Sequence, residues 1–253
     1  MKLFDLTGQT ALITGSSMGI GFALARGLAQ AGAKVVLNAR NADRLESART
    51  KLEIEGHNVV ALAFDVTDPE AARRAIDNFE LNNGPISILV NNAGMQFRQP
   101  LETYPTETFD QLMKTNVSSV FYVGQAVANH MIARGYGKII NIASVQTAMA
   151  RPGIAPYTAS KGAVANLTKG MATDWARLGL NCNAIAPGYF DTPLNAALVA
   201  DPEFCAWIEK RTPTGRWGQI DELVGACIFL ASPASSYVNG QTLFVDGGMT
   251  ACL

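Results

Sequence analysis

The sequence predicts an α/β protein built on a doubly wound, seven-stranded parallel β-sheet with helices on both faces. Short apolar segments alternate with longer segments of helical period, and no low-complexity or linker stretch separates them. Strands joined through helices form right-handed crossovers and lie parallel, and apolar strand interiors indicate a sheet covered on both faces. We expect one domain spanning residues 1–253, with strands at 10–14, 34–39, 58–64, 86–90, 138–142, 181–185 and 242–245, and helices at 20–31, 42–55, 68–82, 106–134, 157–178 and 221–231.

The composition fits a sizeable apolar core and gives no sign of a polyanionic partner. The chain has 253 residues, of which 48% are hydrophobic and 16% charged, and its formal net charge is −1. A nearly neutral chain lacks the basic surface that binds nucleic acid or an anionic membrane. We therefore expect neither partner, and an anionic substrate would have to meet local basic residues.

The cysteines, the histidines and the amino terminus argue against three further classes of protein. The 4 cysteines lie apart from one another and from the 2 histidines, without a CxxC pair, so we expect no metal site and no disulfide framework. Asp5 stands where a signal peptide would enter its apolar region, and no apolar run approaches ~18 residues. These features indicate a soluble, cytoplasmic protein.

The first expected strand runs into a glycine-rich turn, TGSSMGIG, that opens a helix. Glycines let the backbone approach a phosphate closely, and a helix N-terminus offers it free amides and a positive dipole end. Gly15, Gly19 and Gly21 therefore predict a pyrophosphate site and a Rossmann fold. The spacing is not GxGxxG, and tight packing of strand on helix is the alternative. Ser16 and Ser17 could contact phosphates or cap the helix.

The end of the second strand distinguishes NADP(H) from NAD(H). An acidic residue there would hold the ribose 2′-hydroxyl and repel a 2′-phosphate, whereas an arginine attracts the phosphate. The chain reads LNARN, with Arg40 followed by Asn41 and no acid. This pattern favours NADP(H), although Arg40 could be an ordinary solvated charge and Met18 adds no second basic residue from the glycine-rich turn.

Two polar stretches follow later strands, at the edge where open α/β folds bind cofactors. Asp65 follows the third strand and could accept from the adenine amino group or cap the next helix. The stretch NNAG, which includes Asn92, Ala93 and Gly94, follows the fourth strand. Asn116 is a polar residue inside an otherwise apolar helix, which indicates a functional role, a brace between strands or a distortion of the helix.

Tyr157 and Lys161 form the pair with the clearest chemistry. If their segment is helical, both side chains lie on one face, one turn apart. An ammonium near a phenol stabilises the phenolate and lowers the tyrosine pKa, which would make Tyr157 a general acid/base. A surface tyrosine and lysine at helical spacing is the common alternative. Ser144 follows the fifth strand and is expected at the same edge of the sheet as the glycine-rich turn, which favours the catalytic interpretation.

These motifs occur together, in order, in the short-chain dehydrogenase/reductase family, which the chain resembles over essentially its whole length. The resemblance is carried by TGSSMGIG, NNAG, Asn116, Ser144, Tyr157-x-x-x-Lys161 and Pro187-Gly188. It implies hydride transfer between NADP(H) and a secondary alcohol or ketone, with Asn116, Ser144, Tyr157 and Lys161 as catalytic residues. The implied cofactor-binding residues are Gly15, Ser17, Met18, Gly19, Ile20, Gly21, Arg40, Asn41, Asp65, Val66, Asn92, Ala93, Gly94, Tyr157, Lys161, Pro187, Gly188 and Thr192.

The resemblance also implies a role for each catalytic side chain. Tyr157 exchanges the proton of the substrate oxygen while hydride moves between nicotinamide C4 and the carbinol carbon. Ser144 holds the same oxygen and stabilises its developing charge. Lys161 lowers the pKa of Tyr157 and binds the nicotinamide ribose, and Asn116 supports a water that relays the proton. The stretch from the Pro-Gly pair to Thr192 closes on the nicotinamide carboxamide.

Longer strings resemble the subgroup of the family that interconverts D-gluconate and 5-keto-D-gluconate: VVLNARN, SVQTAMARPGIAPYTASKGAVANLTKGMATDWARLGL, APGYFDTP, KRTPTGRWGQ and VDGGMT. A sugar acid needs a partner for its carboxylate, and a guanidinium binds one bidentately. Arg98 and Arg151 are the candidates, and each could instead be a solvated loop charge. The expected substrate-binding residues are Arg98, Ser144, Gln146, Arg151, Tyr157 and Tyr189, with a mobile substrate flap at 190–217.

The expected helices at 106–134 and 157–178 carry few charges, with none at 115–129. A helix that is apolar nearly all round is buried on more than one side. A deep core would explain this within one chain, and the resemblance favours a homotetramer. Two other functions stay open: a reductase of other carbonyl compounds, such as 3-ketoacyl thioesters, and a non-catalytic NADP(H) sensor on the same fold.

Overall fold

The computed structural model describes residues 2–252, and within them seven parallel strands form one sheet in the order β3-β2-β1-β4-β5-β6-β7. The chain order reverses between β1 and β4, which is the switch point where open α/β sheets bind ligands. The predicted fold class is confirmed. The strands are β1 (Thr10–Ile13), β2 (Lys34–Leu37), β3 (Val59–Ala61), β4 (Ile88–Asn91), β5 (Gly137–Ile142), β6 (Leu180–Pro187) and β7 (Thr242–Val245).

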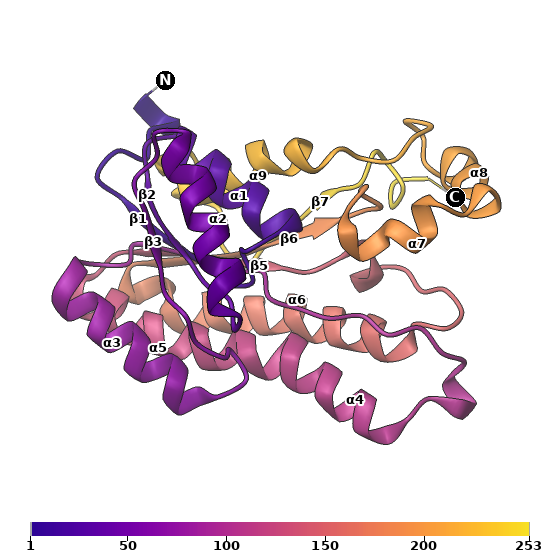
Figure 1. The fold of residues 1–253 in the computed structure, drawn as a ribbon, viewed down its shortest axis with the longest axis horizontal. Helices are drawn as coiled ribbons and strands as arrows, with labels where there is room; N and C mark the ends of the chain where they lie inside the picture. The colour runs from indigo at the N-terminus through magenta and orange to yellow at the C-terminus, as the bar shows by residue number, and fades with distance from the viewer. Residues whose placement is uncertain (1, 253) are drawn as a thin grey trace.

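Helices cover both faces of the sheet (Figure 1). One face carries α1 (Gly19–Gln30), α2 (Ala42–Ile54) and α9 (Val224–Ala231), and the other carries α3 (Pro69–Asn83), α5 (Ser119–Arg134) and α6 (Ala155–Trp175). No helix among residues 2–252 has the length and apolarity needed to cross a membrane. The remaining helices are α4 (Thr106–Met113), α7 (Ala196–Val199), α8 (Pro202–Arg211), and the single turns at Lys2–Phe4, Leu101–Thr103, Val145–Thr147, Ala176–Leu178, Pro193–Asn195, Ile220–Leu223 and Pro233–Ser235.

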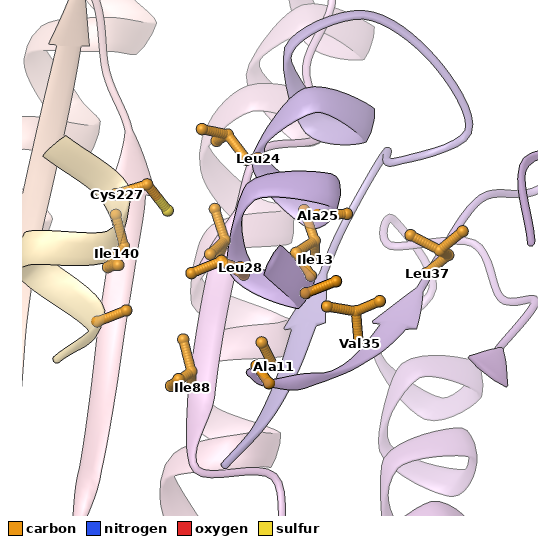
Figure 2. Close-up of a cluster of buried hydrophobic side chains, with 14 of the residues drawn as sticks. Ala11, Ile13, Leu24, Ala25, Leu28, Val35, Leu37, Ile88, Ile140 and Cys227 are labelled. Atoms are coloured by element: carbon orange, nitrogen blue, oxygen red, sulfur yellow. The ribbon is translucent and has the colours of Figure 1, made fainter. Parts of the chain in front are cut away.

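Each central strand contributes side chains to two apolar cores. On one face, Ile13 of β1 belongs to the cluster that includes Leu24 and Leu28 of α1 (Figure 2). On the other face, Leu12 belongs to the cluster that includes Val123 of α5. Because neighbouring residues of a strand point to opposite faces, strands covered on both sides read as continuous apolar runs. The same apolar runs in the sequence predict these strands.

The long helix predicted at 106–134 is interrupted by one π-helical turn, Lys114–Ser118, between α4 and α5. Such turns are rare and occur frequently at functional sites. Asn116 lies in this turn and is buried. Its side chain accepts from the N–H of Met95 at 2.8 Å and donates to the Met95 carbonyl at 2.9 Å and to Ser160 Oγ at 3.1 Å. Of the alternatives for Asn116, the helix distortion is therefore observed.

Most predicted segments are present with shifted ends, and two α-helices were missed. The strand expected at 58–64 is reduced to Val59–Ala61, and the last turn of the helix expected at 157–178 is 3-10 rather than α. The missed helices are the single-turn α7 and the longer α8, and only α8 has a clear start signal. Asp201 caps it by accepting from the N–H groups of Glu203 and Phe204, and Pro202 occupies its first turn. An Asp-Pro start of this kind is a recognisable helix signal.

The segment predicted as a flap, residues 190–217, holds α7 and α8 and lies beyond the two layers of helices that flank the sheet (Figure 1). Its two ends meet, because Phe190 forms an isolated bridge with Gly218. Its inner side includes Ile208, which packs in a small apolar cluster with Val145 and Met249. Motion of this segment stays a prediction.

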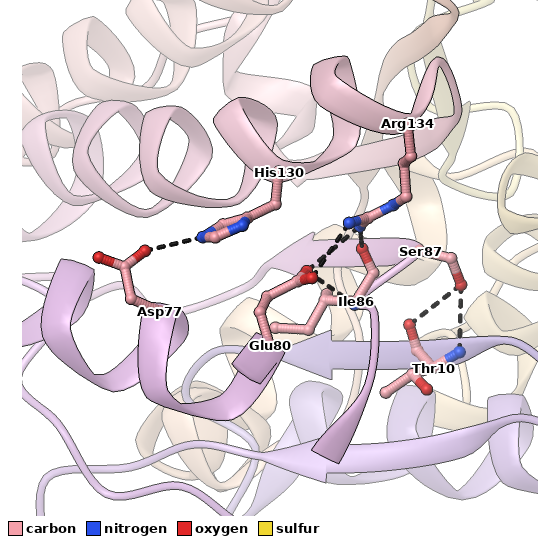
Figure 3. A network of polar contacts seen from close by, with 7 residues as sticks. All are labelled: Thr10, Asp77, Glu80, Ile86, Ser87, His130 and Arg134. Carbon is pink, nitrogen blue, oxygen red and sulfur yellow. Dashed lines mark hydrogen bonds and ion pairs between the residues drawn. The ribbon is translucent and has the colours of Figure 1, made fainter. Parts of the chain in front are cut away.

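The amino end of the sheet carries a network of paired polar groups (Figure 3). Glu80 of α3 accepts from the N–H of Ile86 at 2.8 Å and pairs with Arg134 of α5 at 3.1 Å. Arg134 also donates to the Ile86 carbonyl. His130 of α5 lies 2.7 Å from Asp77 of α3. These contacts tie the loop that enters β4 to both helices of that face.

Candidate active site

A cavity of about 620 Å³ runs along the carboxyl edge of the sheet. It extends from Arg40 and Asp65 past the glycine-rich turn to Tyr157 and Arg98. All the predicted cofactor and substrate residues line it, although they come from segments far apart in the sequence. Asn116 does not line the cavity and lies behind it, since a Cβ on Gly94 would be 3.4 Å from its side-chain oxygen.

The glycine-rich turn has the conformation that a phosphate site requires. Gly15 and Gly19 have positive φ values of 61° and 58°. A Cβ on Gly21 would lie 2.4 Å from Asn92 Nδ2 and 2.6 Å from the Gly15 carbonyl, so no other residue fits there. The N-cap of α1 is Met18, which makes no side-chain cap bond. The first N–H groups of α1 are therefore free to bind an anion.

The NNAG stretch braces this turn. Asn92 Nδ2 donates to the carbonyls of Thr14 at 2.9 Å and Gly15 at 3.1 Å, and Thr14 Oγ1 accepts from the N–H groups of Asn92 and Ala93 at 3.0 Å. Ser16 is buried and donates to a β1 carbonyl at 2.7 Å. Neither serine of the turn is the N-cap of α1. Ser16 is part of the brace, and Ser17 lines the cavity.

Asp65 and Arg40 face each other at one end of the cavity. Their side chains approach to 3.7 Å and are both partly exposed. Burial opposes ionisation of Asp65, but hydrogen bonds from the N–H and hydroxyl of Thr67, helped by Arg40, outweigh it and hold its pKa below the usual value. Asp65 is therefore a carboxylate at neutral pH and can accept a hydrogen bond.

Arg44 is a second basic residue at this end, and sequence reasoning missed it. It lies in the first turn of α2, where its N–H donates to Asn41 Oδ1 at 2.8 Å, and it lines the cavity. Asn41 is therefore the N-cap of α2 as well as a cavity residue. The available signal was the spacing of Arg40 and Arg44 across a helix start, four residues apart.

Ser144, Tyr157 and Lys161 meet at the other end of the cavity. Ser144 follows β5, and its hydroxyl accepts from the N–H of Gln146 at 3.2 Å. Tyr157 lies in the first turn of α6 and Lys161 one turn later, as the sequence predicted. Lys161 Nζ donates to the Ile142 carbonyl at 2.7 Å and lies 5.7 Å from the centre of the Tyr157 ring.

Burial dominates the pKa values of this pair. It raises the pKa of Tyr157 to about 12, against the opposing effect of a hydrogen bond with Ser144. It lowers the pKa of Lys161 to about 8. The lowering of the tyrosine pKa by Lys161, expected from the sequence, is not found: the ammonium is turned to a backbone carbonyl, and the groups that oppose the rise are Ser144 and Arg98.

Arg98 and Arg151 enter the same cavity from two different loops. Arg98 donates to Gln96 Oε1 at 3.0 Å and Asn195 Oδ1 at 3.3 Å, and Arg151 lies over the ring of Phe204, with Cζ 5.3 Å from its centre. Burial, reinforced by the charge of Arg151, lowers the pKa of Arg98. Among residues 2–252 neither guanidinium forms an ion pair, and both Nε atoms are buried without a partner.

The loop after β6 forms the far wall of the cavity. A Cβ on Gly188 would lie 2.8 Å from Asp246 Cα, so a glycine is needed where this loop passes β7. Tyr189 follows, and burial raises its pKa, although Arg151 opposes the rise. Thr192 is buried in the same wall. Pro187, Gly188, Tyr189 and Thr192 are thus brought together in the cavity that Tyr157 also lines.

Comparisons with known proteins agree with this geometry. A family model described as enoyl-(acyl carrier protein) reductase matches residues 15–250. The chain is 61% identical to gluconate 5-dehydrogenase of Gluconobacter oxydans, over 99% of this chain and 98% of the relative. It is 49% identical to 5-keto-D-gluconate 5-reductase of Escherichia coli, over 98% of this chain and 97% of the relative.

A solved structure is similar over the whole chain. The gluconate 5-dehydrogenase of Burkholderia cenocepacia, in complex with NADP and tartrate, has a TM-score of 0.98 and 57% identity, with 100% of this chain and 99% of that chain covered. The fold and the edge of the sheet that carries the cavity define a dinucleotide-dependent enzyme class. The chain belongs to the short-chain dehydrogenase/reductase family, as its motifs predicted.

Proposed function

We propose that the protein is an NADP(H)-dependent oxidoreductase that interconverts D-gluconate and 5-keto-D-gluconate. An oxidoreductase acting on a CH–OH group follows from the family and the relatives. The observation that carries the sugar-acid substrate is the pair Arg98 and Arg151, which line the cavity next to Ser144 and Tyr157. Within the described chain neither has an acidic partner, so a substrate carboxylate is the anion that fits there.

The residues along the cavity fit NADP(H). Gly15 and Gly21 have no room for side chains, so backbone lines the middle of the cavity, where the N-terminus of α1 can hold a pyrophosphate. Arg40 and Arg44 supply the basic groups that a 2′-phosphate needs, and Asp65 is placed to accept from the adenine amino group. The NADP complex of the Burkholderia relative supports the same cofactor.

The proton chemistry belongs to Tyr157. The bound cofactor supplies or accepts the hydride. In reduction, the phenol of Tyr157 donates its proton to the carbonyl oxygen, and its pKa of about 12 keeps it protonated at neutral pH. In oxidation it takes the proton back, and Ser144 and the charge of Arg98 stabilise the phenolate. We assign Lys161 to the nicotinamide ribose. Ser144 hydrogen-bonds the same substrate oxygen and stabilises its developing charge.

Asn116 acts from behind the cavity. Its amide holds the backbone of Met95, in the loop after β4, and Ser160 of α6. These contacts fix the helix that carries Tyr157 and Lys161 relative to the sheet edge. We assign to Asn116 the support of a water that relays the proton between the active site and solvent.

The substrate is held at both of its ends. Its reacting carbon lies at Ser144 and Tyr157, and its carboxylate lies at Arg98 and Arg151. Gln146 and Tyr189, which line the intervening wall, are the candidates for hydrogen bonds to the hydroxyl groups. The segment 190–217 provides the outer wall and is the proposed flap.

A substrate panel tests this function. Oxidation of NADPH is followed with 5-keto-D-gluconate, 2-keto-D-gluconate, the neutral ketose L-sorbose and a 3-ketoacyl thioester. L-sorbose carries a hydroxymethyl group where 5-keto-D-gluconate carries its carboxylate. We expect 5-keto-D-gluconate to have the highest kcat/KM. Preference for the thioester would assign a ketoacyl reductase, and tight NADPH binding without any turnover would assign a sensor.

We also propose that the protein is a homotetramer. The helices α4 and α5 expose large apolar side chains, with Phe109 39% and Phe121 43% exposed in the single chain. Aromatic area of this kind is buried favourably against a second subunit. Light scattering coupled to size-exclusion chromatography measures the mass directly, and a monomer would contradict the proposal. The cytoplasmic location stays a prediction of the sequence.

A further inference from the structure

Four aromatic side chains form a cluster that reaches the substrate end of the cavity through one member, Tyr189. The cluster consists of Tyr189, Phe204, Trp207 and Trp217. Tyr189 is at its centre, with ring centres 5.6 Å from Phe204 and 5.9 Å from each tryptophan. Phe204 also packs on Trp207 at 5.3 Å and on Trp217 at 6.0 Å. Edge-to-face and tilted contacts of this kind fix the orientation of the rings.

Phe204 is the member of this cluster that meets Arg151. The guanidinium carbon lies 5.3 Å from the centre of the Phe204 ring, within the range of a cation–π interaction. Arg151 comes from the loop before α6, whereas Phe204 comes from α8 in the segment 190–217. The contact therefore joins Arg151, which lines the cavity, to the segment 190–217.

An aromatic ring holds an arginine differently from an acid. A carboxylate partner would occupy the N–H donors of the guanidinium and neutralise its charge, and a substrate carboxylate would have to displace it. A ring face attracts the cation and leaves its N–H donors free. Arg98 is likewise held by uncharged groups, the side-chain oxygens of Gln96 and Asn195.

We propose that Phe204 is a positioning residue for carboxylate recognition, which rests on the proposed sugar-acid function. Its ring fixes the guanidinium of Arg151 before substrate binds. The ring does not occupy the N–H donors that the substrate carboxylate needs. Binding then requires less ordering of a long side chain, because part of the rotamer entropy is already lost in the free enzyme. Phe204 acts through Arg151 and does not itself touch the reacting atoms.

The test compares three single variants on the acidic and the neutral substrate. Phe204→Leu keeps an apolar side chain but removes the ring face, and we expect KM for 5-keto-D-gluconate to rise roughly 3- to 30-fold, the range of a cation–π contact. We expect kcat, KM for NADPH and kcat/KM for L-sorbose to change by less than about twofold. Phe204→Tyr keeps the ring and should restore KM. Trp207→Leu removes an aromatic ring from the same helix without removing the one beneath Arg151, and should leave KM within about twofold.

A double-mutant cycle separates positioning from general packing. Arg151→Ala should raise KM for 5-keto-D-gluconate, and adding Phe204→Leu to it should raise KM no further. The positioning role would be overturned if Phe204→Leu raised KM for 5-keto-D-gluconate by the same factor in wild type and in Arg151→Ala. It would also be overturned if Trp207→Leu raised KM as much as Phe204→Leu does. An unchanged KM in Arg151→Ala would overturn it as well.

Binding without turnover distinguishes the two proposals. Calorimetry with D-gluconate in the presence of NADPH, a pair that cannot react, gives Kd for each variant. A wild-type enzyme that neither binds D-gluconate nor reduces 5-keto-D-gluconate contradicts the proposed function. A wild-type enzyme that does both, with Kd unchanged in Phe204→Leu, contradicts only the role of Phe204. A Kd that rises in parallel with KM supports both.

Discussion

The two ends of the sheet treat charge in opposite ways. At the amino end, Arg134 pairs with Glu80 at 3.1 Å, and both side chains also hydrogen-bond the backbone of Ile86 (Figure 3). At the carboxyl end, Arg98, Arg151 and Lys161 enter one cavity, and in the described chain none of them forms an ion pair. Because an unpaired buried charge costs free energy, it persists where a ligand supplies the partner. Balanced charge marks the amino end of the sheet, and unbalanced charge marks the substrate end of the cavity, whereas at the cofactor end Arg40 and Asp65 approach to 3.7 Å.

The largest expected effect is at the carboxyl end. Tyr157→Phe removes the phenolic proton donor and should lower kcat by about 10²- to 10⁴-fold, the usual contribution of a general acid/base. NADPH binding, followed by fluorescence, and the thermal midpoint should stay close to wild type, because the ring is retained. A variant with near-normal kcat would contradict the assignment and weaken the contrast between the two ends.

The second prediction concerns the cofactor end of the same cavity. Arg40→Ala removes a charge that the proposal places at the 2′-phosphate, and KM for NADPH should rise roughly 10-fold or more. KM for NADH, which lacks this phosphate, should change by less than about twofold and is the internal control. Equal changes for the two cofactors would mean that Arg40 does not recognise the 2′-phosphate.

The third prediction concerns the Glu80–Arg134 ion pair at the amino end of the sheet. Glu80→Gln removes the charge that balances Arg134, whose side chain is only 26% exposed, and should lower the free energy of unfolding by about 1 to 3 kcal/mol with kcat unchanged. Glu70→Gln is the matched control, because its pair with Arg73 is about 60% exposed on both sides and should contribute less than about 0.5 kcal/mol. Urea denaturation measures both, and equal losses would refute the distinction.

The smallest expected effect comes from Lys138, the exception at the amino end. Burial lowers its pKa to about 8, and it donates to Asn181 Oδ1 at 2.9 Å instead of pairing with an acid. The unfolded chain holds this proton up to its ordinary pKa of about 10.5, so between these values the unfolded state binds more protons. The wild-type protein therefore gains stability from this group as pH rises from about 8 to 10.5.

Lys138→Met tests this sign. The variant has no buried ammonium, so at pH 7 its free energy of unfolding should be about 1 to 2 kcal/mol higher than that of wild type. Because both proteins share every other titrating group, the difference between their unfolding free energies should shrink as pH approaches 10.5. Urea denaturation at pH 7, 9 and 10.5 measures it, and a difference that grows with pH would contradict the prediction.

Sequence reasoning succeeded where a local pattern has a direct structural meaning. Apolar runs and helical periods predicted the sheet. The glycine-rich turn located the middle of the cavity, and the spacing of Tyr157 and Lys161 located its substrate end. It failed for α7 and α8, which lie in the segment predicted only as a flap, and for Arg44, which reads as an ordinary helical charge. Phe204 carries no motif at all, because its contact with Arg151 joins segments that are adjacent only in the fold.

The sequence by itself determined the class of fold, the family and the edge of the sheet that carries the chemistry, because periodicity and short motifs are local properties of a chain. Only the tertiary structure decided the pKa of Tyr157, the absence of an acid beside Arg98 and Arg151 within the described residues, and the ring beneath Arg151. Desolvation and charge balance depend on everything that surrounds a group in space. Neighbours of that kind come from every part of the chain.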